Sequence, residues 1–203
     1  MTYYTDSLGD ENVLEYLNQV LNTKLEDEKV NSEKYLFGGC DNMKQYSVKI
    51  SVKKSETTQK IVNIVKPFFE KAGLEINTNN GYIHYESNKY DSMKYVNNYE
   101  LGTENEGYWD HVNVCFIITK KSDNLKGGNI DVYNTYPSFL QMIGYEKEDK
   151  NEVCLSEGDV FVMSGDTPYK IKGCSGSGHF NFIIVAFYKN KRFGYRYDND
   201  DDE

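Results

Sequence analysis

The sequence predicts an α+β fold in which N-terminal helices pack against an antiparallel β barrel. Apolar residues recur at helical spacing within residues 1–80, whereas from residue 81 onward their period changes to two. The later apolar runs are short and are separated by clusters of Gly, Asn, Asp and Ser, which is typical of antiparallel strands. We expect one domain over residues 1–197, with a helical support region at 1–80 and the barrel at 81–190.

Two amphipathic helices are predicted in the support region. The first covers about residues 10–27. The second begins after Ser55, a favourable N-cap residue, and stops at Gly73. Pro67 is expected to kink it. We interpret both apolar faces as packing surfaces that support the barrel.

Three strands of the barrel show a clear alternation of inward apolar residues. The alternating residues are Val112, Val114, Phe116 and Ile118 in one strand, Ile130 and Val132 in another, and Phe180, Phe182, Ile184 and Ala186 in the last.

Composition narrows the function classes. A net charge of −9 disfavours nucleic acid as a partner, because that affinity comes from Lys and Arg. The end of the chain, residues 198–203, predicts an acidic tail. No apolar stretch reaches the about 20 residues that cross a bilayer, so no membrane is expected. The four cysteines form no disulfide or zinc pattern, which predicts a reducing, cytoplasmic setting.

Four segments, taken in order, resemble the prolyl-hydroxylase-type Fe(II)/2-oxoglutarate-dependent dioxygenases. They are residues 85–95 (YESNKYDSMKY), residues 111–133 with the Gly127–Gly128 pair, residues 158–163 (GDVFVM) and residues 179–188 (HFNFIIVAFY). This resemblance implies a double-stranded β-helix, or jelly-roll, barrel. The Gly-Asp pair followed by alternating apolar residues also resembles a cupin motif, which has the same barrel.

The resemblance also implies positions for the iron ligands and the cosubstrate anchor. Met93 and Tyr95 stand where the family has its His-x-Asp pair, and Tyr169 falls about where the family has its distal histidine. His179 stands where an Arg or Lys would grip 2-oxoglutarate. A neutral phenol is a weak ligand near neutral pH, so we expect a degenerate site with no metal and no cofactor.

A second alignment keeps the chemistry. His84 and Glu86 spell His-x-Glu, His179 would be the distal histidine, and Lys189 would anchor the cosubstrate. The cofactors would then be Fe(II) and 2-oxoglutarate. This alternative predicts that His84, Glu86 and His179 converge at the barrel mouth.

The main hypothesis is a catalytically degenerate, prolyl-hydroxylase-like domain that acts by binding a protein partner. Some poxviral hydroxylase-like domains resemble this description. The Tyr-rich, Pro-poor composition suggests an A/T-rich genome, such as that of a large DNA virus, a protist or a low-G+C bacterium. For a viral protein the expected compartment is the host cytoplasm or nucleus. The expected contact loops are residues 88–107 and 136–151. The expected anchors are aromatic residues: Tyr90, Tyr95, Tyr99, Tyr108 and Trp109.

Two other functions stay open. One is an active Fe(II)/2-oxoglutarate-dependent dioxygenase that hydroxylates a prolyl or other residue. The other is a cupin-like binder of a small molecule, which would have a closed apolar pocket.

Overall fold

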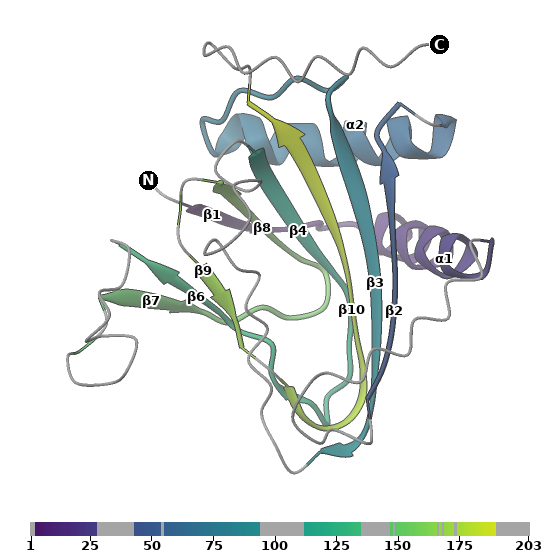
Figure 1. Ribbon diagram of the computed structural model, residues 1–203, viewed down its shortest axis with the longest axis vertical. Coiled ribbons are helices and arrows are strands. Elements are labelled where there is room, and N and C mark those ends of the chain that lie inside the picture. The colour runs from purple at the N-terminus through teal and green to yellow at the C-terminus, as the bar shows by residue number, and fades with distance from the viewer. Residues whose placement is uncertain are drawn as a thin grey trace, which may run out of the picture.

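Two β-sheets and two helices make up the described part of the chain (Figure 1). The computed structural model describes residues 3–27, 43–53, 55–93, 112–134, 147, 149–165, 167, 169–172 and 174–189. The helices are α1 (Glu11–Asp27) and α2 (Glu56–Lys71). The strands are β1 (Tyr3–Ser7), β2 (Met43–Ser51), β3 (Gly81–Met93), β4 (Val112–Lys121), β5 (Lys126–Gly127), β6 (Ile130–Tyr133), β7 (Lys150–Val153), β8 (Asp159–Ser164), β9 (Tyr169–Ile171) and β10 (Cys174–Tyr188).

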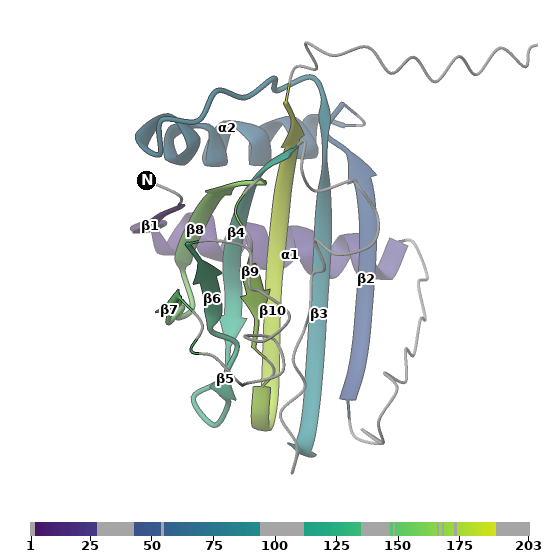
Figure 2. The same ribbon diagram turned by 60° about the vertical axis from the view of Figure 1, so that its left-hand side comes forward.

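The larger sheet has the order β1-β8-β4-β10-β3-β2, and every neighbouring pair in it is antiparallel. The short strand β5 pairs with the first residues of β10. The smaller sheet has the order β7-β6-β9; it lies to the left of the larger sheet in Figure 1 and comes forward in the turned view of Figure 2. The predicted α+β class with a jelly-roll barrel is confirmed by this arrangement.

The core has two layers, one on each face of the larger sheet. One layer fills the barrel between the two sheets and includes Phe116, Phe161 and Phe182. The other joins the opposite face of the larger sheet to both helices and includes Ile117, Leu17 and Phe69. Residues 112–119 of β4 are therefore all buried, although only every second one was predicted to be.

The second helix begins as its sequence predicts. The Ser55 hydroxyl accepts from the Thr58 backbone N–H, and the Thr58 hydroxyl accepts from the Ser55 N–H, which is a capping box. The helix continues through Pro67 to Lys71. Gly73 follows with φ of 71°, a conformation that ends a helix and favours glycine.

The outer face of the smaller sheet is held by an ion-pair network. The Asp131 carboxylate on β6 is buried and lies 2.8 Å from Lys150 Nζ on β7 and 3.1 Å from Lys172 Nζ. Lys172 Nζ also lies 2.8 Å from Glu152 Oε1. The network ties β6 to β7 and to the residue after β9, so we interpret it as structural.

Two strands of the larger sheet were not predicted. Both β1 and β2 lie within residues 1–80, which the sequence had assigned to helical support alone. They extend the barrel sheet at its two ends. Within the described residues, no helix is long and apolar enough to cross a membrane. The expected acidic tail at 198–203 lies outside the described residues.

Candidate functional site

Three polar residues of β3 face the interior of the barrel. His84, Glu86 and Asn88 alternate along β3 between Tyr82 and Tyr90, which both belong to the barrel core. In the register they lie opposite Ile184, Phe182 and Phe180 of β10, which point into the same core. The side chains of directly paired residues share one face of a sheet, so this polar row faces inward.

The row is joined by hydrogen bonds to one carboxylate. His84 Nε2 lies 3.0 Å from Glu86 Oε2, and Asn88 Nδ2 donates to Glu86 Oε1 at 2.9 Å. The Glu86 side chain is only 6% exposed and that of His84 27%. A buried carboxylate needs such partners, because desolvation is costly without them. The arrangement can hold a charged group at the edge of an otherwise apolar interior.

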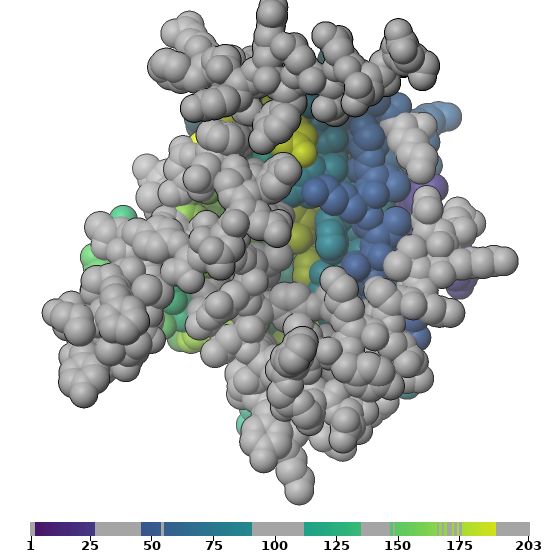
Figure 3. Space-filling model, in the orientation of Figure 1, coloured from purple at the N-terminus to yellow at the C-terminus, as the bar shows by residue number. Residues whose placement is uncertain are grey.

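Lys49 of β2 lies directly opposite His84. Its Nζ stands 3.6 Å from the centroid of the Tyr82 ring. Partial burial lowers the pKa of Lys49 below its ordinary value. Tyr82 in turn packs edge-on against Tyr188. Atoms of β2, β3 and β10 are visible on this side of the molecule in Figure 3.

Tyr169, the residue that the sequence resemblance predicts at the distal-ligand position, is buried inside the barrel. Its ring packs edge-on against Phe116, with centroids 5.8 Å apart. Its hydroxyl oxygen is buried and has no hydrogen-bond partner among the described residues. Burial raises the pKa of Tyr169, so the phenol stays neutral at physiological pH. A neutral, buried phenol is a poor ligand for ferrous iron.

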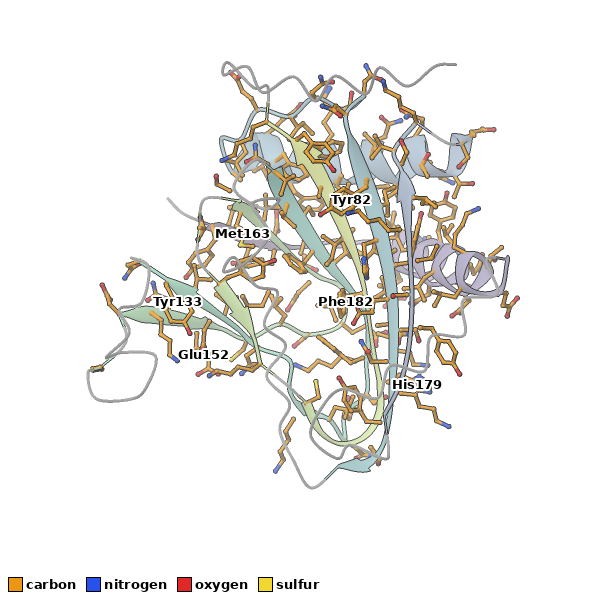
Figure 4. The ribbon with its side chains drawn as sticks, in the orientation of Figure 1. Tyr82, Tyr133, Glu152, Met163, His179 and Phe182 are labelled. Atoms are coloured by element: carbon orange, nitrogen blue, oxygen red, sulfur yellow. The ribbon has the colours of Figure 1, made fainter. Side chains whose placement is uncertain are left out.

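His179 does not join His84 and Glu86. His179 pairs with Lys89, whereas His84 pairs with Ile184. His179 and Ile184 are five residues apart on β10, which is about 17 Å in an extended strand. Phe180 and Phe182 face the barrel core, and neighbouring residues of a strand face opposite sides. The side chain of His179, next to Phe180, therefore belongs to the opposite face of the sheet. Figure 4 shows His179 near the lower end of the sheet, far from Tyr82.

Lys189 lies beyond the other end of β10, where its Nζ donates to Ser164 Oγ at 2.8 Å. It is ten residues from His179 along one extended segment, about 33 Å. The two residues therefore do not share one cosubstrate site in this structure.

The remaining predicted residues divide into two groups. Tyr90 is only 3% exposed and belongs to the barrel core, so it does not fit its predicted role as a surface anchor. Met93 ends β3 opposite Gly176, so residues 88–93 are strand and not loop. Tyr95, Tyr99, Tyr108 and Trp109 lie outside the described residues, as does nearly all of the loop at 136–151.

Sequence reasoning missed Asn88 and Lys49. Asn88 follows His84 and Glu86 at the same spacing of two, which was readable once the strand was extended beyond Glu86. Lys49 lies on a strand that was not predicted, so nothing in the sequence placed it beside His84.

Solved oxygenase structures resemble this fold. A Pseudomonas putida prolyl-4-hydroxylase gives a TM-score of 0.52 at 8% identity, covering 94% of each chain. A 2OG-Fe(II) oxygenase-family oxidoreductase from Burkholderia pseudomallei gives 0.55 at 12% identity, covering 93% of this chain and 84% of its own. The chain has the fold of the 2-oxoglutarate-dependent oxygenases.

Other oxygenase structures agree with that fold, whereas sequence comparisons add nothing. The epimerase SnoN, solved with Fe3+, alpha ketoglutarate and nogalamycin RO, gives a TM-score of 0.56 at 11% identity, covering 93% of this chain and 81% of its own. No protein-family model matches the sequence. The search of curated proteins likewise gives no match.

The expectation of no cofactor is contradicted by these neighbours. They are Fe(II)/2-oxoglutarate oxygenases, and one of them was solved with iron and the cosubstrate bound. The cofactors that the oxygenase fold implies are therefore Fe(II) and 2-oxoglutarate.

The described residues do not fit that metal well. The oxygenase site needs two histidines and one carboxylate on one face. The inward face here offers His84 and Glu86, whereas Tyr169 is a neutral phenol and His179 lies on the other face. Within the described residues, no group of three His, Cys, Asp or Glu side chains is placed to hold a metal ion.

Proposed function

We propose that this chain is a prolyl-hydroxylase-like barrel, degenerate at its catalytic positions, that acts as a protein-interaction module. The observation that carries the proposal is that Tyr169, the residue predicted at the distal-ligand position, is a buried phenol packed on Phe116. Catalysis by this fold needs an open coordination position inside the barrel. Here the rings of Phe116 and Tyr169 pack against each other in that interior.

The proposal is supported by how the interior is filled. Phe116 contacts the Phe161 ring on the neighbouring strand and the Tyr169 ring on the smaller sheet, and Phe180 packs on Phe182. All five side chains are at most 6% exposed. A scaffold can keep its fold while its function moves to its surface. The fold would then serve to hold a binding surface in shape.

The second candidate is an active dioxygenase that uses the hydrogen-bonded pair His84 and Glu86. The fold and this pair favour it. Its third proposed ligand, His179, would have to cross from the other face of the sheet and move along β10.

An activity assay separates these two functions. The purified chain is given Fe(II), ascorbate and 2-oxoglutarate, and succinate is measured against a metal-only blank. We expect succinate at the level of the blank, both for the parent chain and for Glu86→Gln. Succinate above the blank that is lost in Glu86→Gln would establish the dioxygenase.

The interaction role needs its own measurement. An extract of the source cells is fractionated by size, and the chain is detected in each fraction. We expect it in a complex well above its own 23.5 kDa, and we expect chemical cross-linking followed by mass spectrometry to join it to one protein. Elution at its own mass, with no cross-linked protein, would overturn the proposal.

A further inference from the structure

The long edge strand β2 is the feature of the described residues that the proposed function leaves unused. The two sheets end at β1, β2, β7 and β9. Of these, β2 is the longest with nine residues, against five in β1, four in β7 and three in β9. It pairs with β3 on one side, and no described strand pairs with its other side. Figure 2 shows it as the outermost strand of the sheet.

An edge strand presents a row of backbone N–H and C=O groups that can pair with another chain. In β2, Val48 and Ile50 are buried against the helices, so the strand is held in place on that face. Pairing with β3 is continuous from Met43 to Ser51. The edge is therefore preformed along the whole of β2, with no register shift, as an added strand requires.

The charge of β2 indicates what kind of strand it accepts. It contains Lys44 and Lys49 and no acidic residue. The Lys49 ammonium stands over the Tyr82 ring, and no carboxylate of the described residues lies within ion-pair distance of it. Partial burial lowers the pKa of Lys49, so an anion beside it would favour its charged form.

A strand added beside β2 would place one of its side chains directly opposite Lys49. Opposite charges in that relation stabilise a sheet, and like charges destabilise it. A second copy of β2 would bring lysines together in the registers that pair Lys49 with Lys49 or with Lys44, so self-pairing in those registers is disfavoured. An acidic strand complements the edge.

We propose that β2 accepts an extended acidic segment of a protein partner as an additional strand, with a carboxylate opposite Lys49. This inference rests on the proposed function, because it names the surface and the chemistry of the partner. Backbone pairing would supply the affinity, and Lys49 would supply the preference for an acidic sequence.

Labelled peptides of about ten residues test the inference, since that length spans a strand of this size. One alternates Thr and Glu, one alternates Thr and Lys, and one is the Thr/Glu peptide with alternate amides N-methylated. We expect binding, by fluorescence anisotropy, of the first peptide only. N-methylation should abolish binding because it removes the donors that pair with the edge. Amide hydrogen exchange should slow in β2.

Charge reversal sharpens the test. In Lys49→Glu, affinity for the Thr/Glu peptide should fall by about tenfold or more, and the Thr/Lys peptide should now bind. The matched control is Lys66→Glu on the exposed face of α2, where Lys66 Nζ lies 3.7 Å from Glu70. It changes the net charge equally and should leave peptide affinity unchanged.

Several results would overturn the inference. These are absence of binding, equal binding of the Glu and Lys peptides, equal effects of the two charge reversals, or binding without slower exchange in β2. Concentration-dependent dimers with protected β2 amides would assign the edge to a second copy instead. If Lys49→Glu still forms the cellular complex, the inference about β2 is refuted but the proposed function is not. If the parent chain itself forms no complex, the proposed function is refuted.

Discussion

The hydroxyl of Tyr169 is a buried polar atom without a hydrogen-bond partner among the described residues. Such an atom costs free energy, so Tyr169→Phe should raise the free energy of unfolding by about 1 kcal/mol. Urea denaturation, monitored by far-UV circular dichroism, measures this change in the free energy of unfolding. A clear fall in stability would show that the hydroxyl has a partner, such as a bound water or ligand.

Tyr4→Phe is the matched control for that substitution. Its hydroxyl donates to Asp6 Oδ2 at 2.8 Å on the solvent side of the molecule. Removing a hydroxyl that is already satisfied should give a small loss of stability. The two tyrosines should therefore change stability in opposite directions.

Sequence reasoning at the residue scale was uneven. The His84–Glu86 contact follows from a spacing of two on one strand, and the structure places the two side chains 3.0 Å apart. The alternation that predicted Phe180 and Phe182 to face inward also places His179 on the other face. The dioxygenase alternative needed His179 to face inward, and that conflict was already readable in the sequence.

Among the elements, β1 is fastened to α2 by one charged contact. Asp6 Oδ2 lies 2.7 Å from Lys71 Nζ. Hydrogen bonds from Lys71, then from the Ser7 backbone and Tyr4, lower the pKa of Asp6 from 3.8 to about 2. A carboxyl group with a lowered pKa in the folded state stabilises the protein above its unfolded-state pKa.

This contact predicts the direction of a pH effect. Its contribution should be complete above about pH 4 and should be lost as the pH falls toward 2. Thermal unfolding between pH 5 and 2 should therefore show a shallower decline in Asp6→Asn than in the parent chain. Lys71→Met should give a smaller flattening, because the hydrogen bonds from the Ser7 backbone and Tyr4 remain. Parallel curves for all three proteins would contradict the assignment.

The elements differ in how well the sequence predicted them. Both helices were predicted, because each has an apolar stripe and the second has a cap at Ser55 and a stop at Gly73. Strand β2 was missed because only Val48 and Ile50 give it an apolar pattern, on the face that packs against the helices. Its other face carries polar residues, and its place is set by pairing with β3, which lies 30 residues or more away in sequence.

The whole molecule has its most protected strands in the middle of the larger sheet. Both β4 and β10 have neighbours on each side and covered faces. Their amides should exchange only through global unfolding, whereas those of the edge strands β1 and β2 should exchange faster through local opening. Hydrogen exchange followed by mass spectrometry or NMR measures this order. Exchange in β2 as slow as in β10 would mean that another segment covers the edge.

At this scale the fold was predictable and the chemistry was not. Alternating strands, the Gly127–Gly128 pair and the Gly158–Asp159 turn were enough to predict the barrel. A barrel, however, is specified by patterns of apolar residues, whereas a metal site depends on which face a few side chains occupy. Patterns of apolar residues do not determine whether a cofactor binds. The expectation of no cofactor therefore lacked support from them, and the oxygenase neighbours contradict it.

The position of β10 has a consequence for how the chain is made. This strand joins β3 to β4 in the larger sheet, yet it follows all the other described strands along the chain. Until it emerges from the ribosome, β3 and β4 each have an unpaired edge in the growing chain. The sheet must then close through contacts between residues far apart in sequence, which is slow. The unpaired edges of β3 and β4 should therefore make the nascent chain prone to aggregation until β10 has emerged from the ribosome.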